Sequence, residues 1–348
     1  MFRLALVCLA LSYSLVLSEI DPEEDIDLED ETKLRSQFED FKVKYDKEYD
    51  EQDEETRFQI FVQNLKEAKR IQEQDRGTAV YGVTKFSDLS DEEFQTYYLN
   101  PVISNNNDTW PEEVLWTEES GRLANLSCPR YWDWRRRGAV TAVINQRRCS
   151  AGWAFGVVGN IEALLYLKTK VLRSLSVQEL LDCDSWDRGC RGGYPYNAFN
   201  AIMKLGGLMS SIRYRYRARR CSRCSFVRTR IITTIRTYQN IRPYEHEMAA
   251  WLSQRSPFIV TINGFYLKHY RTGIIRPRVG QCSSYTLNHV ALVVAYNTCG
   301  GVNYWTLKNS WGTQWGMNVS GSHSYIRTRG PGLSAPRTCS TSSHSHQG

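Results

Sequence analysis

The spacing of hydrophobic residues predicts helices in the first quarter of the chain. Between residues 53 and 72, one face of a 3.6-residue helix carries Phe58, Phe61, Leu65, Ala68 and Gln72. A shorter run over 38–45 has the same spacing and predicts another helix ahead of it. These two segments therefore form a helical amino-terminal unit.

The rest of the chain divides into a helix-rich part and a strand-rich part. Helical spacing, with a candidate capping box at Ser176 and Glu179, predicts helices over 145–167, 176–183 and 195–205. Apolar runs of strand length predict strands over 258–262, 289–296 and 304–308, with a short helix over 245–254. Alternation of Tyr, Ile or Thr with Arg predicts a further strand within 213–236. This order favours an α+β fold.

The ends and joins of the chain differ in composition from these parts. Residues 1–18 combine Arg3 with an apolar run, which predicts a secretory signal peptide. The domains expected are 19–98 for the helical unit, 99–127 for a surface linker rich in Asn, Glu and Ser, and 128–316 for the main domain. Residues 317–348 are rich in Ser, Arg and His and predict a tail without regular structure. No later segment has the length and apolarity of a transmembrane helix.

Charge is divided unevenly along the chain. The formal net charge is +6, yet residues 1–127 hold 13 Lys and Arg against 30 Asp and Glu. The remainder is strongly basic, and nine arginines lie between Arg213 and Arg236. Two interpretations stay open: the basic part docks the acidic amino-terminal unit, or it binds a linear polyanion such as a sulfated glycosaminoglycan.

Three motifs in the main domain carry candidate chemistry. They are Asn-Gln-Arg-Arg-Cys-Ser-Ala-Gly-Trp-Ala-Phe at 145–155, Leu-Asn-His-Val-Ala-Leu-Val-Val at 287–294 and Lys-Asn-Ser-Trp-Gly at 308–312. Together they resemble the papain-like cysteine peptidases, the cathepsins. The resemblance implies a two-lobed fold, with a helical lobe and a β-barrel-like lobe around a cleft. It also implies that His289 pairs with a nucleophilic thiolate, that Asn309 orients His289, and that Gln146 helps to bind the oxyanion.

Motifs in the amino-terminal unit point to the same family. The helix over 53–72 matches the propeptide helix of the cathepsin F and W branch through Arg57, Phe61, Asn64, Ala68 and Gln72. Residues 81–89 match its second propeptide motif. The resemblance therefore implies an α-helical inhibitory propeptide. In the cleft it implies a wall at Gly192 and Gly193 and binding contributions from Trp311, which shields the Asn–His contact, and from Trp315.

The position of the family's nucleophile is occupied by Gly152. Glycine has no side chain to attack a carbonyl, and loss of a catalytic nucleophile costs about a million-fold in rate. Arg147 and Ser150 also stand where the family has glycine, and a bulky Arg147 is hard to place where the backbone is tight. The sequence therefore predicts a homologue without peptidase activity.

The ten cysteines are too many for one pattern to explain. Cys8 leaves with the signal peptide, and the resemblance implies the pairs Cys149–Cys190, Cys183–Cys224 and Cys282–Cys339. Cys221 is an alternative to Cys224, and Cys128 and Cys299 are left over. Candidate glycosylation sites lie at Asn107, Asn125 and Asn318.

The prediction is an inactive, monomeric cathepsin F-like protein of the secretory pathway, lysosomal or extracellular. Its expected partners are its own propeptide, and peptides or protein inhibitors in the cleft; no cofactor or metal is expected. Three alternatives stay open. They are an active cysteine-type endopeptidase whose true residue at 152 is Cys, a secreted polyanion-binding module, and the product of a decaying gene that barely folds.

Overall fold

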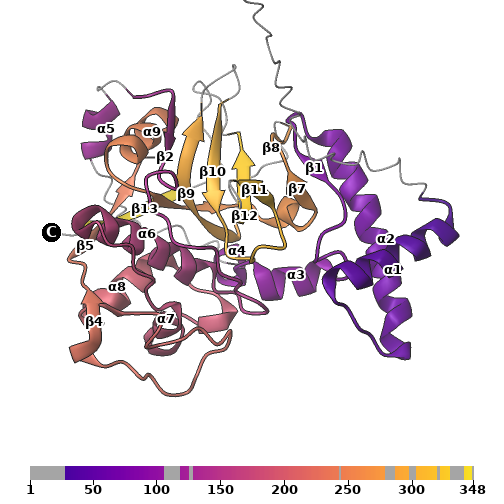
Figure 1. The fold of residues 1–348 in the computed structure, drawn as a ribbon, viewed down its shortest axis with the longest axis horizontal. Coiled ribbons are helices and arrows are strands. Elements are labelled where there is room, and N and C mark those ends of the chain that lie inside the picture. Colours follow the sequence, from indigo (N-terminus) through magenta and orange to yellow (C-terminus); the bar gives the residue numbers. More distant parts are fainter. Residues whose placement is uncertain are drawn as a thin grey trace, which may run out of the picture.

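The computed structural model describes residues 28–105, 118–124, 128–242, 244–278, 287–297, 303–319, 322–329 and 341–346. The expected signal peptide, the sequons at Asn107 and Asn125, and the expected Cys282–Cys339 pair lie outside these residues. Figure 1 shows a central sheet flanked by helices, with the amino-terminal helices at one end of the molecule.

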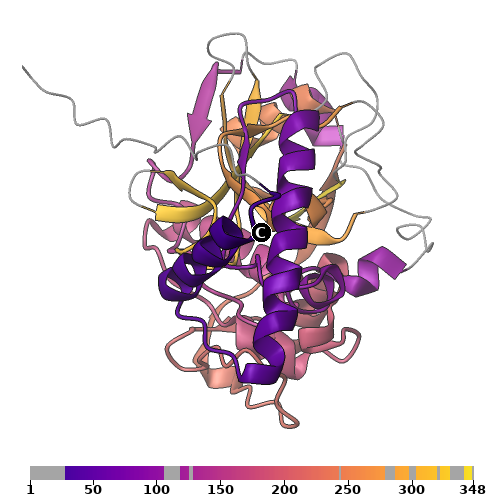
Figure 2. The ribbon, with the colours of Figure 1, turned by 90° about the vertical axis from the view of Figure 1, so that its right-hand side faces the viewer.

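The amino-terminal unit is helical, as predicted. Its elements are α1 (Glu31–Tyr45), α2 (Glu51–Gln74), β1 (Val80–Tyr81) and α3 (Asp91–Tyr98). Figure 2 shows α2 running along one face of the molecule with α1 crossing it. The predicted apolar faces meet at this crossing, where Phe38, Phe41, Phe58 and Phe61 are all buried. Burial of these four rings stabilises the crossing.

The expected surface linker over 99–127 is wrong where the structure describes it. Leu99 and Asn100 are buried, and α4 (Pro101–Asn105) follows them directly. Farther along, α5 (Glu118–Ala124) packs beside α9 (Glu245–Gln254). The polar composition misled the prediction, because Leu99 and Leu123 alone are enough to anchor these two short pieces in the core.

The helical lobe is built around α6 (Gly152–Thr169). Its other elements are α7 (Val177–Cys183), η1 (Gly189–Arg191), α8 (Pro195–Leu205), β3 (Leu208–Met209), η2 (Arg228–Arg230) and β4 (Ile231–Thr233). Ser176 caps α7 as predicted, by accepting from the Glu179 backbone N–H at 3.0 Å. The Glu179 carboxylate instead accepts from the Met209 backbone N–H, which ties α7 to β3.

The second lobe is built on one mixed sheet. Along the sheet the strands run β11 (Met317–Val319), β12 (Ser322–Thr328), β10 (Tyr304–Lys308), β9 (His289–Asn297), β6 (Phe258–Ile262), β13 (Thr341–His346) and β5 (Thr237–Ile241). Further elements of this lobe are β2 (Tyr131–Asp133), β7 (Tyr270–Thr272), β8 (Ile274–Ile275), α9 and η3 (Phe265–Lys268).

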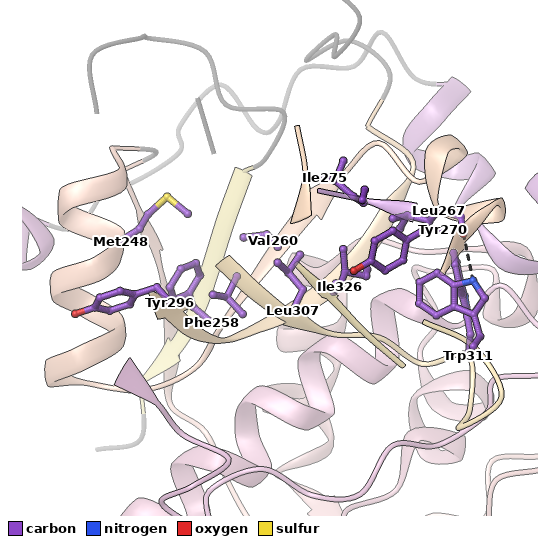
Figure 3. Packing of buried hydrophobic residues seen from close by; sticks show 14 of the residues in the cluster. Met248, Phe258, Val260, Leu267, Tyr270, Ile275, Tyr296, Leu307, Trp311 and Ile326 are labelled. Atoms are coloured by element: carbon purple, nitrogen blue, oxygen red, sulfur yellow. Dashed lines mark hydrogen bonds between the residues drawn. The ribbon is translucent and has the colours of Figure 1, made fainter. Parts of the chain in front are cut away.

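The core of this lobe lies between the sheet and α9. Figure 3 shows Phe258, Val260, Leu307 and Ile326 in a row beneath the strands, with Met248 of α9 at one end. The continuous apolar runs over 258–262 and 289–296 are explained by burial on both faces, since β6 and β9 lie in the middle of the sheet.

The predicted strand within 213–236 is wrong over most of its length. Tyr214 is buried and Arg213 and Arg215 are exposed, so the alternation of side chains is real. No strand pairs with residues 213–227, however, because side chains satisfy this backbone instead. Gln178 accepts from the Arg217 N–H at 2.7 Å and donates to the Arg219 carbonyl at 2.7 Å. The segment lies flat on the helical lobe.

The expected absence of regular structure in 317–348 is also wrong for the residues that the structure describes there, 317–319, 322–329 and 341–346. β11 and β12 form one edge of the sheet, and Tyr325 and Ile326 are buried against it. The backbone of β13 pairs with β6 on one side and β5 on the other. A polar, Ser-rich composition concealed these strands, because it lacks the apolar run that predicted β6, β9 and β10. No helix in the described part of the chain has the length and apolarity needed to cross a membrane.

Candidate active site

The start of α6 faces an imidazole. His289 is the first residue of β9, and its Nε2 lies 2.8 Å from Oδ1 of Asn309, which directly follows β10. Because a carbonyl oxygen only accepts, Nε2 carries the hydrogen and donates it. The other ring nitrogen, Nδ1, faces Gly152, where a Cβ atom would lie 3.5 Å from it. The two predicted partners of a thiolate are therefore assembled around a residue that has no side chain.

The imidazole of His289 is deeply buried. Only 1% of the residue is exposed. Burial disfavours the imidazolium and lowers the pKa of His289 to about 4, although the hydrogen bond to Asn309 opposes this shift. His289 is therefore neutral at pH 7. A negative charge at position 152 would be needed to stabilise its protonated form.

Two tryptophans enclose this pair. The Trp311 ring lies 4.8 Å from the His289 ring at a tilt of 39°, and the Trp315 ring lies 4.4 Å from Trp311. Trp311 is completely buried. Its position over His289 agrees with the predicted shielding of the Asn–His contact from water, because an apolar ring there excludes solvent from the hydrogen bond.

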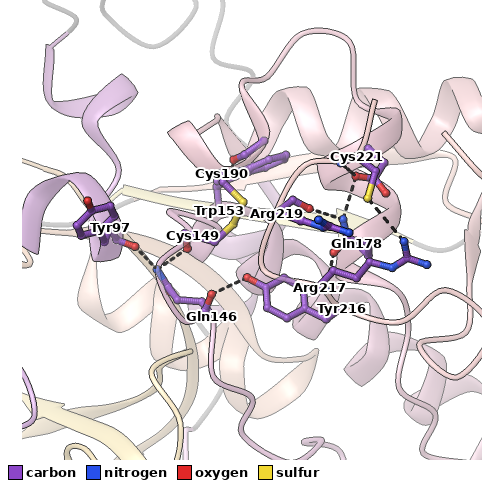
Figure 4. Close-up of a disulfide and its surroundings, with 12 residues drawn as sticks. Tyr97, Gln146, Cys149, Trp153, Gln178, Cys190, Tyr216, Arg217, Arg219 and Cys221 are labelled. Atoms are coloured by element: carbon purple, nitrogen blue, oxygen red, sulfur yellow. Dashed lines mark hydrogen bonds between the residues drawn. A yellow bond between two sulfur atoms is a disulfide. The ribbon is translucent and has the colours of Figure 1, made fainter. Parts of the chain in front are cut away.

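The Gln146 side chain, six residues before Gly152 in the chain, is held by four partners, the most distant of which is the Tyr97 carbonyl at 3.4 Å. Its Oε1 accepts from the Ser310 hydroxyl at 2.6 Å, and its Nε2 donates to the carbonyls of Cys149 at 2.9 Å and Tyr98 at 3.2 Å. Figure 4 shows the amide between the Cys149–Cys190 disulfide and Tyr97. The amide donor that an oxyanion site requires is thus fixed near position 152. In this structure the donor bonds to a carbonyl of the amino-terminal unit, that of Tyr98.

The segment after α3 runs through the groove between the two lobes. The Asn100 backbone N–H donates to the Asn288 carbonyl at 2.6 Å, and its side-chain amide donates to the Gly193 carbonyl at 2.6 Å. Gly192 has φ +103°, and a Cβ atom there would lie 2.4 Å from Asn100 Oδ1. The expected wall at Gly192 and Gly193 therefore contacts an extended peptide that belongs to this chain.

Family models match both units of the chain. Residues 128–342 match the papain family cysteine protease domain, and residues 38–94 match the cathepsin propeptide inhibitor domain (I29).

The chain belongs to the papain family.

Among papain-family relatives, the chain is 40% identical to cathepsin F of Mus musculus over 317 residues, which cover 89% of this chain and 65% of the mouse protein. It is 34% identical to cathepsin W of Felis catus, covering 82% of this chain and 80% of the cat protein.

Solved structures have the same fold. A recombinant stem bromelain precursor superposes with a TM-score of 0.75 at 28% identity, covering 90% of this chain and 99% of the bromelain chain. Procathepsin L 3 of the Tenebrio molitor larval midgut superposes with a TM-score of 0.73 at 29% identity, covering 90% and 98%. The two-lobed α+β architecture with a helical propeptide is thereby confirmed.

The papain-family propeptide docks on the tryptophans of the site. Phe86 and Phe94 pack edge-on against Trp311, with ring centroids 5.2 and 5.4 Å away. Thr84 donates to the Lys268 carbonyl at 2.6 Å, and the buried Lys85 ammonium donates to the Trp311 carbonyl. The sequence identified the motif over 81–89 but not these contacts, because the contacting residues are far apart in the chain and no local pattern links them.

The loop before α6 carries the substitutions noted in the sequence. Cys149 pairs with Cys190, and Cys183 pairs with Cys224, as the family resemblance implied. Cys221 stays a thiol. Arg147 has φ +55°, a left-handed conformation that is strained for a side chain other than glycine. The Ser150 hydroxyl is buried and has no hydrogen-bond partner among the described residues.

A carboxylate and an ammonium group bridged by a buried hydroxyl were not predicted. Glu162 of α6 and Lys308 of β10 both bond to the Thr141 hydroxyl, at 2.5 and 2.9 Å. Burial raises the pKa of Glu162 and lowers that of Lys308. The three side chains join the helical lobe to the sheet directly below Asn309. A Glu in an otherwise apolar helix was the available sequence signal.

Proposed function

We propose that this chain is a papain-family protein without peptidase activity, whose cleft binds peptides or protein inhibitors. The observation that carries the proposal is the geometry at the start of α6, where Gly152 faces Nδ1 of His289 and offers no nucleophile. Cys149, the cysteine nearest to Gly152 in the chain, does not replace it, because it forms the disulfide with Cys190.

The rest of the site supports retention of a binding role. The His289–Asn309 hydrogen bond, the buried Trp311 and the satisfied Gln146 amide keep the cleft formed without a nucleophile. The cleft also holds the short stretch that joins α3 to α4, since the Tyr98 carbonyl accepts from Gln146 and Asn100 bonds to Asn288 and Gly193. A peptide partner would take this place once the propeptide has been displaced. The two disulfides support an oxidising secretory compartment, lysosomal or extracellular.

The test is active-site labelling of protein made through a secretory pathway. A protease site engineered within residues 106–117 would release the propeptide, and a thiol-directed epoxide would then be added together with a peptide substrate. We expect neither labelling nor hydrolysis. A Gly152→Cys variant prepared in parallel shows whether the epoxide can reach the cleft. Stoichiometric labelling of the unmodified cleft would refute the proposal, and resequencing of the transcript decides whether residue 152 is really Cys.

A second candidate function is polyanion binding by residues 213–236, here called the arginine segment. Its nine arginines are all exposed, and none forms an ion pair with a carboxylate in the part of the chain that the structure describes. In Figure 1, α1 and α2 lie at the opposite end of the molecule from β4, which the arginine segment includes. The described propeptide helices therefore leave these charges uncovered, which favours an external anion over docking of the propeptide.

Heparin chromatography tests this candidate. Retention should fall steeply with salt, and the triple variant Arg215→Gln, Arg219→Gln, Arg223→Gln should lower the slope of log retention against log salt by about 2. The matched control replaces Lys33, Lys44 and Lys66 by Gln, which removes the same charge from exposed propeptide positions. Equal behaviour of the two triple variants, or elution of the parent at physiological salt, would exclude a site on the arginine segment.

A further inference from the structure

A hollow lies against the sheet, on the face opposite the core of the second lobe and far from the cleft. Four strands bring Asp133, Ala295, Thr306 and Arg327 into one row, because these residues are paired across β2, β9, β10 and β12. The chain neighbours of Thr306 and Arg327 that point to the opposite face, Leu307 and Ile326, belong to the core. Ala295 is the smallest member of the row and lies at its centre. The sheet is therefore depressed at this point.

The hollow encloses about 380 Å³, a volume in the range of small-molecule sites. Its lining is formed by Tyr131, Asp133, Arg135, Arg136, Ala295, Tyr296, Asn297, Tyr304, Thr306 and Arg327. Ala295 lies six residues along β9 from His289, so at about 3.3 Å per residue the centre of the hollow is about 20 Å along the strand from the histidine. This site is independent of the cleft.

Positive charge dominates the hollow. Three arginines line it against one carboxylate, Asp133. Both oxygens of Asp133 are already used, since Arg135 donates to them from Nε at 2.9 Å and from Nη2 at 2.7 Å. That pair cancels one charge of each sign. Arg136 and Arg327 remain, so the hollow has a charge excess of two.

The guanidinium groups lie against aromatic rings or a carboxylate, and some of their N–H donors have no acceptor among the described residues. Arg327 lies over the Tyr304 ring at 4.8 Å and Arg136 over the Tyr131 ring at 5.5 Å. Nη1 of Arg135 and Nε of Arg327 are buried, and neither has an acceptor among the described residues. Buried guanidinium donors are normally paired with an anionic oxygen. Their arrangement in the hollow therefore suits a ligand that brings several acceptors and a double negative charge.

We propose that this hollow binds an oxyanion of the sulfate or phosphate class, chiefly through Arg327, Arg135 and Arg136. A tetrahedral oxyanion supplies four acceptor oxygens, and guanidinium forks match that geometry better than ammonium groups do. The polar lining disfavours an apolar ligand. The volume exceeds that of a bare ion, which leaves room for an ester of a sugar-sized group. Sulfate esters and phosphate esters share this chemistry, and the experiment below separates them.

The test uses the full chain and thermal unfolding at pH 7. Sodium sulfate and sodium phosphate are titrated against sodium chloride at equal ionic strength. We expect a saturable rise in Tm at millimolar oxyanion, above the unsaturable rise that sulfate gives with any protein. Glucosamine 6-sulfate and glucose 6-phosphate form the second arm, and the ester that saturates at the lower concentration identifies the carrier.

Two variants tie the effect to the hollow. Arg327→Gln should abolish the saturable rise, and Arg136→Gln, at an exposed position, should weaken half-saturation several-fold. The control is Arg137→Gln, because Arg137 stacks on Trp132 at 3.6 Å and does not line the hollow. If Arg327→Gln fails to fold, Arg136→Gln alone decides. A parent protein without a saturable rise, or equal titrations of parent and Arg136→Gln, would overturn the proposal.

Discussion

Restoring a thiol at position 152 probes the whole site in one step. In Gly152→Cys, the new Cβ would lie 3.5 Å from His289 Nδ1, 3.3 Å from His289 Cε1 and 3.4 Å from the Val290 carbonyl. These neighbours must shift by only a few tenths of an ångström. The backbone of Gly152 is helical, so a side chain is tolerated there. The variant should therefore fold, with its thiol directed toward the imidazole.

Two opposing magnitudes decide how much of that thiol ionises. Burial holds the pKa of His289 near 4 against a normal value of 6.5, and the difference costs about 3 kcal/mol when the imidazolium forms. The Coulomb attraction of a thiolate about 3.5 Å away stabilises the imidazolium by about 5 kcal/mol at an effective dielectric constant of 20. The cost of removing water from the thiolate offsets much of the difference between this attraction and the cost of forming the imidazolium. We therefore expect a thiolate–imidazolium pair that is populated only in part near pH 7.

The expected activity is correspondingly partial. After release of the propeptide, Gly152→Cys should hydrolyse a fluorogenic peptide at least about 1,000-fold faster than the parent, and below the roughly million-fold that a complete nucleophile contributes. Adding Arg147→Gly and Ser150→Gly should raise the rate further, because these changes relieve the left-handed strain at Arg147 and remove the unpaired buried hydroxyl of Ser150 from the loop before α6. The control adds His289→Ala and should lose both activity and epoxide labelling. A folded Gly152→Cys that is inert, or that keeps its activity without His289, would refute the geometry described for this site.

Three further predictions concern stability. Ser150→Ala should raise the free energy of unfolding by about 1 kcal/mol, because it removes a buried hydroxyl without a partner among the described residues. Ser310→Ala should lower the free energy of unfolding by about 1–2 kcal/mol, because it leaves Gln146 Oε1 unpaired. Denaturant unfolding of the two variants checks both signs. Arg147→Gly should leave the protein's stability unchanged or raise it by up to about 1 kcal/mol, because relief of the left-handed strain is partly offset by the greater entropy of the unfolded chain. Arg148 has no positive φ, so Arg148→Gly should destabilise the protein. Burial lowers the pKa of His269 to about 3, below its unfolded value of 6.5. As the pH falls, the unfolded state therefore binds the proton first. The free energy of unfolding should fall by about 1.4 kcal/mol per pH unit between about 6.5 and 3. His269→Leu should flatten that part of the pH profile, and an unchanged slope would contradict the assignment to His269.

The elements that the sequence predicted well are those whose signal is local. Helix α8 has Pro195 at its first position and Gly206 at its end, and the structure has the bounds that these residues predicted. Strands β6 and β10 likewise begin and end where their apolar runs do. In each case the residues that define the element are neighbours in the chain, so one pattern contains the whole signal.

The features that the sequence missed depend on partners far away in the chain. The alternation around Tyr214 predicted a strand, but Gln178 supplies the hydrogen bonds that a neighbouring strand would have made. The edge-on packing of Phe86 against Trp311 joins residues of separate domains. In the candidate site, the resemblance to the papain-like motifs grouped His289, Asn309 and Gln146, whereas the hydrogen bond from the Gln146 amide to the Tyr98 carbonyl depends on how the propeptide docks.

The two disulfides have a consequence for limited proteolysis. The loop that Cys149 and Cys190 close overlaps the loop closed by Cys183 and Cys224. Exposed arginines between positions 213 and 223 are natural cleavage points for trypsin-like enzymes, and they lie inside the second loop. A chain cut there stays in one covalent piece. It would run as intact protein on a non-reducing gel and separate into two fragments only after reduction, so a preparation judged by size alone could be fully nicked.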